Sequence, residues 1–409
     1  MSIPTGKVDL QRAGRPRIAV VDMAVASDSP AGSCVLAQVL GLLASVDLTL
    51  FSERFDHPGL PGVEFIRVRA PERPVVLRYV VFHLSVPMHY LAWWLRGGRA
   101  ACVQATQGQL PGAQICYAHF CHRGYLKRHW PGGSPPGVRR LSRWAVHRFN
   151  AFCEALALRR ARLVVVPSHG LAREIAIDYP GVASKLRVIA NPVAIEHFAR
   201  PDGFDRAAAR AANGFAADNV VLGFMALGDF ARKGLGLLLA ALADLNADGR
   251  ATVRVLVVGG QAGEIAEFAR LACELGVECC VRFVGLQRDV RAFLWACDAF
   301  AFPSAYEIFP LAVAQAAAAG LPVMVCEGVH GVEEFVADGV NGWVIARRRD
   351  AVLGWMNRVL ADRGALPGMG LAAAQAVRPY ALAAFQERWK ELVMALLRGD
   401  GAQTAGQPA

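Results

Sequence analysis

The sequence has little lysine, no cysteines at the spacing of a zinc or dithiol motif, and no long uninterrupted apolar run. Only five of its 44 basic residues are Lys, and none of its ten Cys forms a Cys-x-x-Cys spacing. The usual zinc and dithiol redox motifs are therefore not predicted, and scattered thiols are typical of a reducing cytoplasm. An Asp-x-Asp pair is also absent, so we expect no metal ion and no cofactor.

Two apolar segments bear on membrane insertion. The run Ile18–Val21 is too short for the core of a signal peptide. Tyr79–Leu95 has 17 residues, whereas a transmembrane helix needs about 20. We expect no membrane span. Two alternatives stay open for Tyr79–Leu95: a buried helix kinked at Pro87, or a surface helix that inserts Trp93, Trp94 and leucine side chains into a bilayer.

Acidic residues are missing between Glu72 and Glu154, a stretch that contains 11 Lys and Arg. Residues 1–200 hold 25 basic and 12 acidic residues, whereas residues 201–409 hold 19 and 22. This asymmetry predicts an anionic partner for the first half, such as a membrane surface or a phosphorylated acceptor; a solvated basic face is the alternative. Nucleic acid is not expected, because no reader motif accompanies the basic residues.

Apolar material is abundant and is arranged in alternating segments. Hydrophobic residues make up 54% of the 409 residues, which excludes a mostly disordered chain and predicts two or three domains. Short β-branched runs such as Arg17–Val21 and Asp47–Phe51 alternate with helical periodicity, and the series restarts at Val220–Met225. The alternation predicts α/β domains with parallel sheets, and the restart predicts two doubly wound domains.

Loops after strands are the candidate binding positions, because ligands of open α/β sheets bind at the carboxyl ends of the strands. Gly228–Gly234 places Arg232 and Lys233 beside a helix start, where free N–H groups favour anions. A diphosphate suits this loop; an exposed basic turn is the alternative. Gly259 and Gly285 follow later strands and would let a ligand approach the backbone, although each is a weak signal alone.

The segment Pro303–Leu311 ends a strand and begins an Ala-rich helix. Its carboxylate, Glu307, can accept hydrogen bonds from sugar hydroxyls, and Gln315 lies about two helical turns further on. The alternatives are a charge at the helix N-terminus for Glu307 and an ordinary helix-surface residue for Gln315.

The order of these motifs resembles glycosyltransferase family 4, particularly its lipopolysaccharide-core and exopolysaccharide members. The motifs are Arg-Lys-Gly, Gly-Gly, Val-Gly-x-x-x-Asp and Pro-Ser-x-Tyr-Glu-x-Phe, with later matches at 331–336 and 338–342. The resemblance is specific from about residue 163 to 345. It implies a retaining enzyme that uses a nucleotide-sugar donor. It also implies the GT-B fold, with two Rossmann-like domains facing a central cleft.

The resemblance implies a division of the chain into four parts. Residues 1–195 would form an acceptor-side domain, and residues 196–378 would bind the donor. Residues 379–398 would form a helix that crosses back to the first domain, and residues 399–409 are expected to be a disordered tail.

The resemblance also implies residue roles. Arg232 and Lys233 would neutralise the donor diphosphate, and Glu307 would bind hydroxyls of the donor sugar. Gln315 would hold the ribose where the family usually has a second Glu. His119 is a candidate catalytic residue, with a structural histidine as the alternative. The remaining expected donor-binding residues are Gly32, Gly259, Gly285, Ile308, Phe309, Pro310 and Leu311.

Two departures from the family pattern concern donor binding. Gln315 lacks the charge of a carboxylate but keeps one acceptor oxygen, and Pro310 removes one backbone N–H. We expect activity to survive both. The function implied is that of a cytoplasmic, metal-independent glycosyltransferase at the inner membrane face, acting on a lipid-linked, lipopolysaccharide or exopolysaccharide acceptor. The alternatives are a nucleotide-sugar epimerase of similar fold and a catalytically silent nucleotide-sugar-binding partner.

Overall fold

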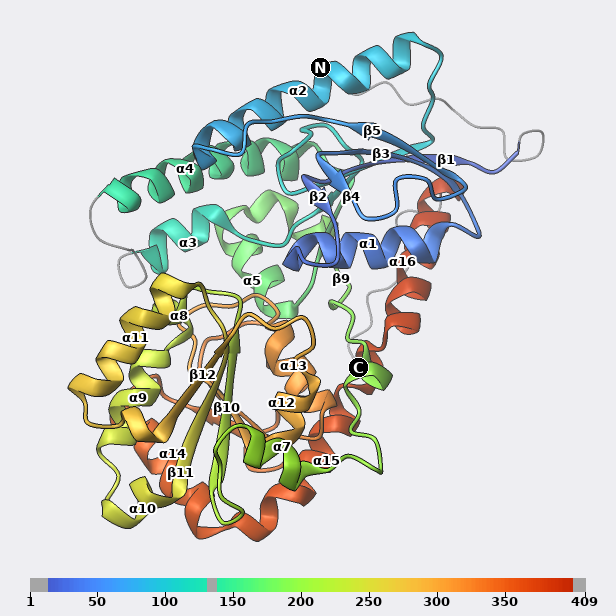
Figure 1. The fold of residues 1–409 in the computed structure, drawn as a ribbon. Coiled ribbons are helices and arrows are strands. Elements are labelled where there is room, and N and C mark those ends of the chain that lie inside the picture. The colour runs from blue at the N-terminus through green and yellow to red at the C-terminus, as the bar shows by residue number, and fades with distance from the viewer. Residues whose placement is uncertain (1–13, 131–137, 400–409) are drawn as a thin grey trace. The chain divides into compact units, whose positions relative to one another are not determined.

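The chain forms two compact α/β units, which a computed structural model describes for residues 14–130 and 138–399 (Figure 1). The first unit combines Met1–Pro192 with Leu382–Ala409, and the second is the continuous segment Val193–Ala381. Residues 400–409, most of the predicted tail, lie outside the described residues.

The first unit is built on a parallel sheet of seven strands in the order β5-β3-β1-β6-β7-β8-β9. A short parallel pair, β2 (Ala24–Val25) and β4 (Arg54–Phe55), lies beside it. The seven strands are β1 (Arg17–Val21), β3 (Asp47–Ser52), β5 (Val63–Arg67), β6 (Cys102–Thr106), β7 (Ile115–Tyr117), β8 (Leu163–Val166) and β9 (Leu186–Val188).

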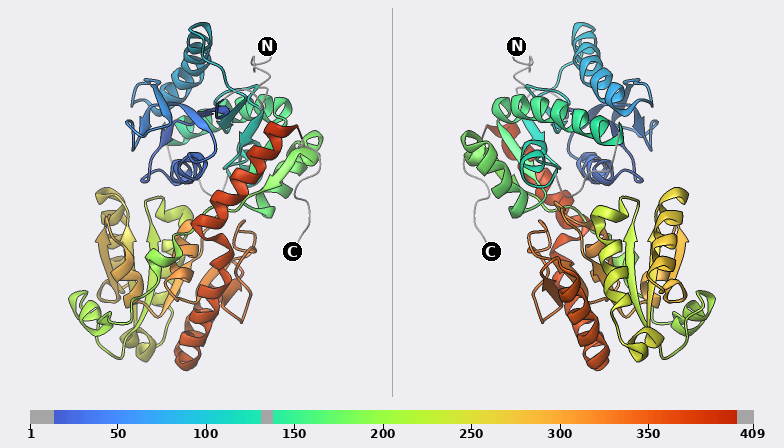
Figure 2. Two further views of the ribbon diagram at one scale, coloured as in Figure 1. Left: turned by 90° about the vertical axis from the view of Figure 1, so that its right-hand side faces the viewer. Right: turned by 90° about the vertical axis from the view of Figure 1, so that its left-hand side faces the viewer.

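The first unit has two hydrophobic cores, and the side chains of β1 alternate between them. Ile18 and Val20 belong to the core that contains α1 (Pro30–Leu42) and α16 (Leu382–Arg398). Ala19 and Val21 belong to the core that contains α2 (Val75–Leu95), because successive side chains of a strand point to opposite faces. Figure 2 shows helices on both faces of this sheet. The remaining helices are α3 (His122–Arg128), α4 (Val138–Arg160) and α5 (His169–Asp178).

Helix α2 is buried on one face and exposed on the other. Within the described chain it alone is long and apolar enough, with a mean hydropathy of 1.3, to cross a membrane by length and composition. One face is buried in the core of the first unit through Phe82, Val86, Tyr90 and Trp93. The opposite face exposes Leu84, Met88, Leu91 and Leu95 by 51–70%.

Of the two alternatives for Tyr79–Leu95, the insertion of Trp93 into a bilayer does not fit the structure. Its side chain is only 6% exposed and packs edge-on against Phe51 at a centroid distance of 5.9 Å. Trp94 is half-buried, and the guanidinium of Arg99 lies 4.7 Å from its ring centroid.

The second unit has a parallel sheet of six strands in the order β12-β11-β10-β13-β14-β15. Its strands are β10 (Val220–Ala226), β11 (Val253–Gly259), β12 (Val281–Gly285), β13 (Ala299–Phe302), β14 (Val323–Cys326) and β15 (Gly342–Ile345). Its helices are α6 (Ile195–Phe198), α7 (Arg206–Ala212), α8 (Phe230–Lys233), α9 (Leu235–Ala243), α10 (Ala247–Thr252), α11 (Ala262–Glu274), α12 (Arg291–Ala296), α13 (Leu311–Ala318), α14 (Arg349–Ala361) and α15 (Leu366–Ala376).

Each sheet has one position where the strand order reverses direction. In the first unit this is the β1/β6 neighbourhood, and in the second it is β10/β13. Loops diverge at such a reversal and leave space outside the carboxyl ends of the strands. The loops after β10 and β13 are the two that carry Lys233 and Glu307. The predicted fold class, two doubly wound Rossmann-like units, is confirmed.

Candidate active site

The loops after β10 and β13 interlock through their backbones. The N–H of Ala305 donates to the carbonyl of Arg232 at 2.9 Å. Gly234, between α8 and α9, has φ +85°, and a Cβ there would lie 2.1 Å from the carbonyl oxygen of Pro303. Any larger residue would force the two loops apart. The glycine therefore fixes the distance between the basic pair and Glu307.

One oxygen of Glu307 collects the polar contacts of both loops. Its Oε1 accepts from the guanidinium of Arg232 at 3.2 Å, from Ser304 Oγ at 2.8 Å and from Lys233 Nζ. Arg232 is held in turn by Asp229 Oδ2 at 2.7 Å and by the carbonyl of Tyr306 at 2.5 Å. Within the described part of the chain, Glu307 Oε2 has no hydrogen-bond partner. The carboxylate is thus fixed in place while one oxygen stays available as an acceptor.

Lys233 lies in a poorly hydrated environment. Its side chain is 16% exposed, and Nζ is 5.0 Å from the ring centroid of Phe302. Burial lowers the pKa of Lys233, and the charge of Glu307 acts in the opposite direction. Charges at such a site interact more strongly than they would in water, which suits the binding of an anion.

Gly259 and Gly285, at the ends of β11 and β12, differ in how much space surrounds them. Gly259 has φ +102°, and a Cβ there would lie 1.9 Å from the carbonyl oxygen of Ala226, so strand packing alone requires glycine. Gly285 has φ +69° and no atom closer than 3.8 Å to an added Cβ, so its surroundings are open. Glu264 accepts from the N–H of Phe230 at 2.6 Å and anchors the start of α8.

The side chains that follow Glu307 differ in exposure, and some of them are buried. Phe309 is 6% exposed and packs against Phe335 and Tyr380, with ring centroids 5.9 and 6.0 Å away. Pro310 precedes α13 without a side-chain cap. Gln315, on α13, is half-buried, and its side chain makes no hydrogen bond to any residue that the structure describes. Ile308 and Leu311 are half-buried.

Two predicted site residues, Gly32 and His119, belong to the first unit. A Cβ on Gly32 would lie 1.7 Å from the carbonyl oxygen of Ala24, so packing of α1 on β2 requires this glycine whatever it binds. His119 follows β7, with its ring centroid 4.0 Å from that of Tyr117. Its Nε2 is buried without a partner among the described residues, and burial lowers the pKa of His119 to about 3. The imidazole is neutral at pH 7, so one ring nitrogen is a donor and the other an acceptor, and the ring lacks the second proton that an imidazolium acid would give up.

The sequence did not single out three residues at these strand ends. Ser304 is fully buried and donates to Glu307, and Phe302 contacts Lys233; both were part of recognised segments, but nothing distinguished them there. Asp22 follows β1 at the reversal of the first sheet, is 4% exposed and accepts from the N–H of Ala24 at 2.8 Å. Burial raises the pKa of Asp22 to about 6. In the sequence, Asp22 could have been recognised as a charged residue that ends the apolar run Ile18–Val21.

A group of three potential metal ligands occurs in the described part of the first unit. Sγ of Cys121 and carboxylate oxygens of Glu174 and Asp178 lie within 4.8 Å of one another, and all three residues are buried. Arg128 already pairs with Glu174 at 2.9 Å and with Asp178 at 2.6 Å, and Lys127 pairs with Asp178 at 2.8 Å. These cations balance the carboxylates, so the arrangement is that of a structural ion-pair network joining α3 to α5.

A protein-family model covers the loops after β10 and β13 in one segment. Residues 219–362 match the model of glycosyl transferases group 1. D-inositol 3-phosphate glycosyltransferase of Nocardia farcinica is 34% identical over 179 residues, which is 41% of this chain and 39% of that protein. The enzyme of the same name from Saccharomonospora viridis is 34% identical over 206 residues, which is 48% of this chain and 47% of that protein. The chain thus spans less than half the length of these relatives.

Solved structures match almost the whole chain. WaaG, a glycosyltransferase involved in lipopolysaccharide biosynthesis, superimposes with a TM-score of 0.72 at 19% identity, covering 93% of this chain and 100% of that one. Sucrose-phosphate synthase from Thermosynechococcus elongatus gives 0.75 at 19% identity, covering 94% and 100%. Anabaena HepE in complex with UDP gives 0.67 at 18% identity, covering 93% and 100%.

The protein therefore has the GT-B fold, the class to which these structures belong. Its second unit carries the glycosyl transferases group 1 segment at residues 219–362. The resemblance to a GT-B glycosyltransferase, drawn from the motifs, is confirmed.

Proposed function

We propose that this protein transfers a sugar from a nucleotide-diphosphate sugar to a lipid-linked or polysaccharide acceptor, with retention of configuration. The observation that carries the proposal is the Arg232–Lys233–Glu307 cluster at the reversal of the second sheet. Further support comes from the relatives named as inositol phosphate glycosyltransferases and from a structural neighbour solved with UDP-glucose. Retention rests on the family resemblance.

The cluster suits the departure of a nucleotide diphosphate. The guanidinium of Arg232, the ammonium of Lys233 and the free N–H groups at the start of α9 would stabilise negative charge as the sugar–phosphate bond breaks. Because two cations are already in place, we propose that no metal ion is needed. The unpartnered Oε2 of Glu307 would accept a hydrogen bond from a sugar hydroxyl, which orients the sugar for transfer.

The first test is a thermal-shift screen with UDP-, GDP- and ADP-glucose, because a ligand that binds only the folded state raises the unfolding midpoint. The second compares donor turnover by wild type, Glu307→Gln and the control Glu267→Gln, whose side chain is exposed on α11. We expect Glu307→Gln to lose most turnover and the control to keep it. A donor that is epimerised rather than consumed by transfer would establish the epimerase alternative. Wild-type turnover in Glu307→Gln would refute the site.

We also propose that the first unit attaches to the anionic inner face of the cytoplasmic membrane. Helices α2 and α4 pack against each other, and each exposes an apolar stripe at helical spacing. On α4 the stripe contains Leu141, Trp144 and Phe152, which are 66, 43 and 71% exposed. Arg140 and Arg148 flank it and are exposed, whereas the side chain of Arg139 lies outside the described residues. Apolar insertion and basic flanks together favour anionic lipid.

Co-sedimentation with vesicles tests this attachment. We expect binding to vesicles that contain phosphatidylglycerol, weaker binding as salt rises, and further weakening in Phe152→Ser. Equal binding to neutral and anionic vesicles, or binding to neither, would contradict the proposal.

A further inference from the structure

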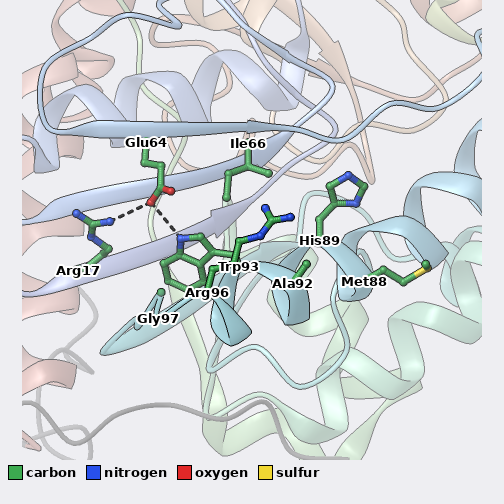
Figure 3. A pocket seen from close by; sticks show the side chains of 10 residues that line it. Arg17, Glu64, Ile66, Met88, His89, Ala92, Trp93, Arg96 and Gly97 are labelled. Carbon is green, nitrogen blue, oxygen red and sulfur yellow. Dashed lines mark hydrogen bonds and ion pairs between the residues drawn. The ribbon is translucent and has the colours of Figure 1, made fainter.

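The first unit contains a cavity of about 770 Å³ beside β1, β5 and α2 (Figure 3). Arg17 is the first residue of β1 and Glu64 is the second of β5, so the cavity lies at the amino ends of these strands. Asp22 and His119 follow the carboxyl ends, at the opposite edge. The residues that matter for its chemistry are Arg17, Glu64, Ile66, His89, Trp93 and Arg96.

Glu64 is held by one of its two carboxylate oxygens. Oε2 accepts from Arg17 at 2.9 Å, from Thr49 Oγ1 at 3.0 Å and from the indole N–H of Trp93 at 3.1 Å. The other oxygen, Oε1, has no hydrogen-bond partner among the residues described. Three donors thus orient the carboxylate, and one acceptor remains for a ligand.

Two further groups in the cavity have unused hydrogen-bonding capacity. Figure 3 shows the guanidinium of Arg96 folded back into the cavity between Trp93 and His89, and it forms no ion pair or hydrogen bond within the described ranges. Nδ1 of His89 lies 2.9 Å from the carbonyl oxygen of Ser85. A carbonyl only accepts, so Nδ1 carries the proton and Nε2 is an acceptor in the neutral ring.

These groups define a ligand with a phosphate and hydroxyl donors. A guanidinium pairs best with phosphate or carboxylate, and the carboxylate oxygen and Nε2 can both accept from hydroxyls. Arg17 offsets the charge of Glu64, so Arg96 supplies the net positive charge of the cavity. The rim is apolar: Met88 is 69% exposed and continues into Leu91 and Leu95 along α2.

We propose that this cavity binds the headgroup of a phosphatidylglycerol-type glycerophospholipid. The phosphate pairs with Arg96, the glycerol hydroxyls donate to Glu64 Oε1 and His89 Nε2, and an acyl chain follows Met88 along the exposed stripe of α2. The inference goes beyond sugar transfer, since it concerns a separate edge of the first unit and would hold whatever the donor is.

The test uses a soluble short-chain lipid, dihexanoyl-phosphatidylglycerol, below its micelle concentration, so that adsorption to a bilayer plays no part. The readout is the indole N–H resonance of Trp93 in the full chain, assigned with Trp93→Phe. Wild type is compared with Arg96→Gln and with the control Arg187→Gln, whose guanidinium donates to the nearby carbonyls of Ser184 and Leu186 at 3.0 and 2.8 Å.

We expect a saturable shift of the Trp93 resonance in wild type and in the control. Arg96→Gln should bind about tenfold more weakly, which corresponds to about 1.4 kcal/mol. Glycerol 3-phosphate, which lacks acyl chains, should bind more weakly than the lipid. Absence of a saturable shift, or unchanged affinity in Arg96→Gln, would overturn the proposal, and equal affinity for glycerol 3-phosphate would overturn the assignment to a lipid. Loss of sugar transfer with lipid binding intact would count against the proposed function alone.

Discussion

Replacing Lys233 by Met separates charge from packing at the Arg232–Lys233–Glu307 cluster. Methionine preserves most of the apolar length that contacts Phe302 but removes the ammonium that pairs with Glu307. Glu307 keeps Arg232 at 3.2 Å and Ser304 at 2.8 Å, so its charge is not left alone. The stability cost should therefore fall below the roughly 3–5 kcal/mol of an uncompensated buried charge, and the variant should fold.

The effect on transfer should be larger than the effect on stability. A hydrogen bond to a charged group contributes about 1.5–3 kcal/mol, which corresponds to a loss of roughly 10- to 150-fold in kcat/KM. The loss should appear in kcat as well as KM, because charge on the leaving diphosphate grows in the transition state.

The assay measures kcat and KM for the nucleotide sugar that gives the largest thermal shift. The control is Lys390→Met, which removes another lysine paired with a glutamate, Glu387 at 3.1 Å, on the exposed surface of α16. We expect the control to behave as wild type. Transfer by Lys233→Met within error of wild type would refute the role of this cation, and unfolding would refute the packing argument.

Three further predictions follow from the same structure. Gln315→Glu should be tolerated and should tighten donor binding, because it adds charge to a side chain with no hydrogen-bond partner among the described residues. Calorimetry measures the donor affinity. A tenfold loss of that affinity, equivalent to about 1.4 kcal/mol, would contradict the prediction. Gly234→Ala should lower the unfolding midpoint by several degrees, about 2–4 °C per kcal/mol, because its Cβ would lie 2.1 Å from the carbonyl oxygen of Pro303; an unchanged midpoint would show that the loops part easily. Burial raises the pKa of Glu154 from 4.5 to about 7. The protonated carboxyl therefore contributes stability below pH 4.5, and this contribution is lost as pH rises towards 7. Between these pH values, the free energy of unfolding measured by urea titration should fall less steeply in Glu154→Gln than in wild type.

The predictable parts of the protein were those with a local signal. Strands such as Val253–Gly259 are short runs rich in valine, and the helix after Pro310 follows from its alanines. Lys233 and Glu307 were each predicted as site residues from motif order, but their contact was not, because it joins two loops whose residues lie 74 positions apart. That contact is set by the strand order β10–β13, which residue spacing does not encode.

Features that depend on packing were not predictable. Trp93 looked like a membrane anchor in the sequence, but its helical phase turns it towards Phe51. Phe309 was expected to line the donor site, and nothing in the sequence indicated that its ring packs with Phe335 and Tyr380. The lipid-headgroup cavity combines Arg17, Glu64 and Arg96 from three elements, and none of these residues stands in a motif.

The first unit contains residues from both ends of the chain, so its folding can be completed only after α16 has been synthesised. Phe385, Trp389 and Val393 of α16 belong to the same core as β1 and α1, although 339 residues (43–381) lie between α1 and α16. A ribosome therefore releases the whole second unit, residues 193–381, before the first unit can complete its core. The first half of the chain emerges earliest yet matures last, and a nascent chain stalled anywhere before α16 exposes the apolar surface of α1.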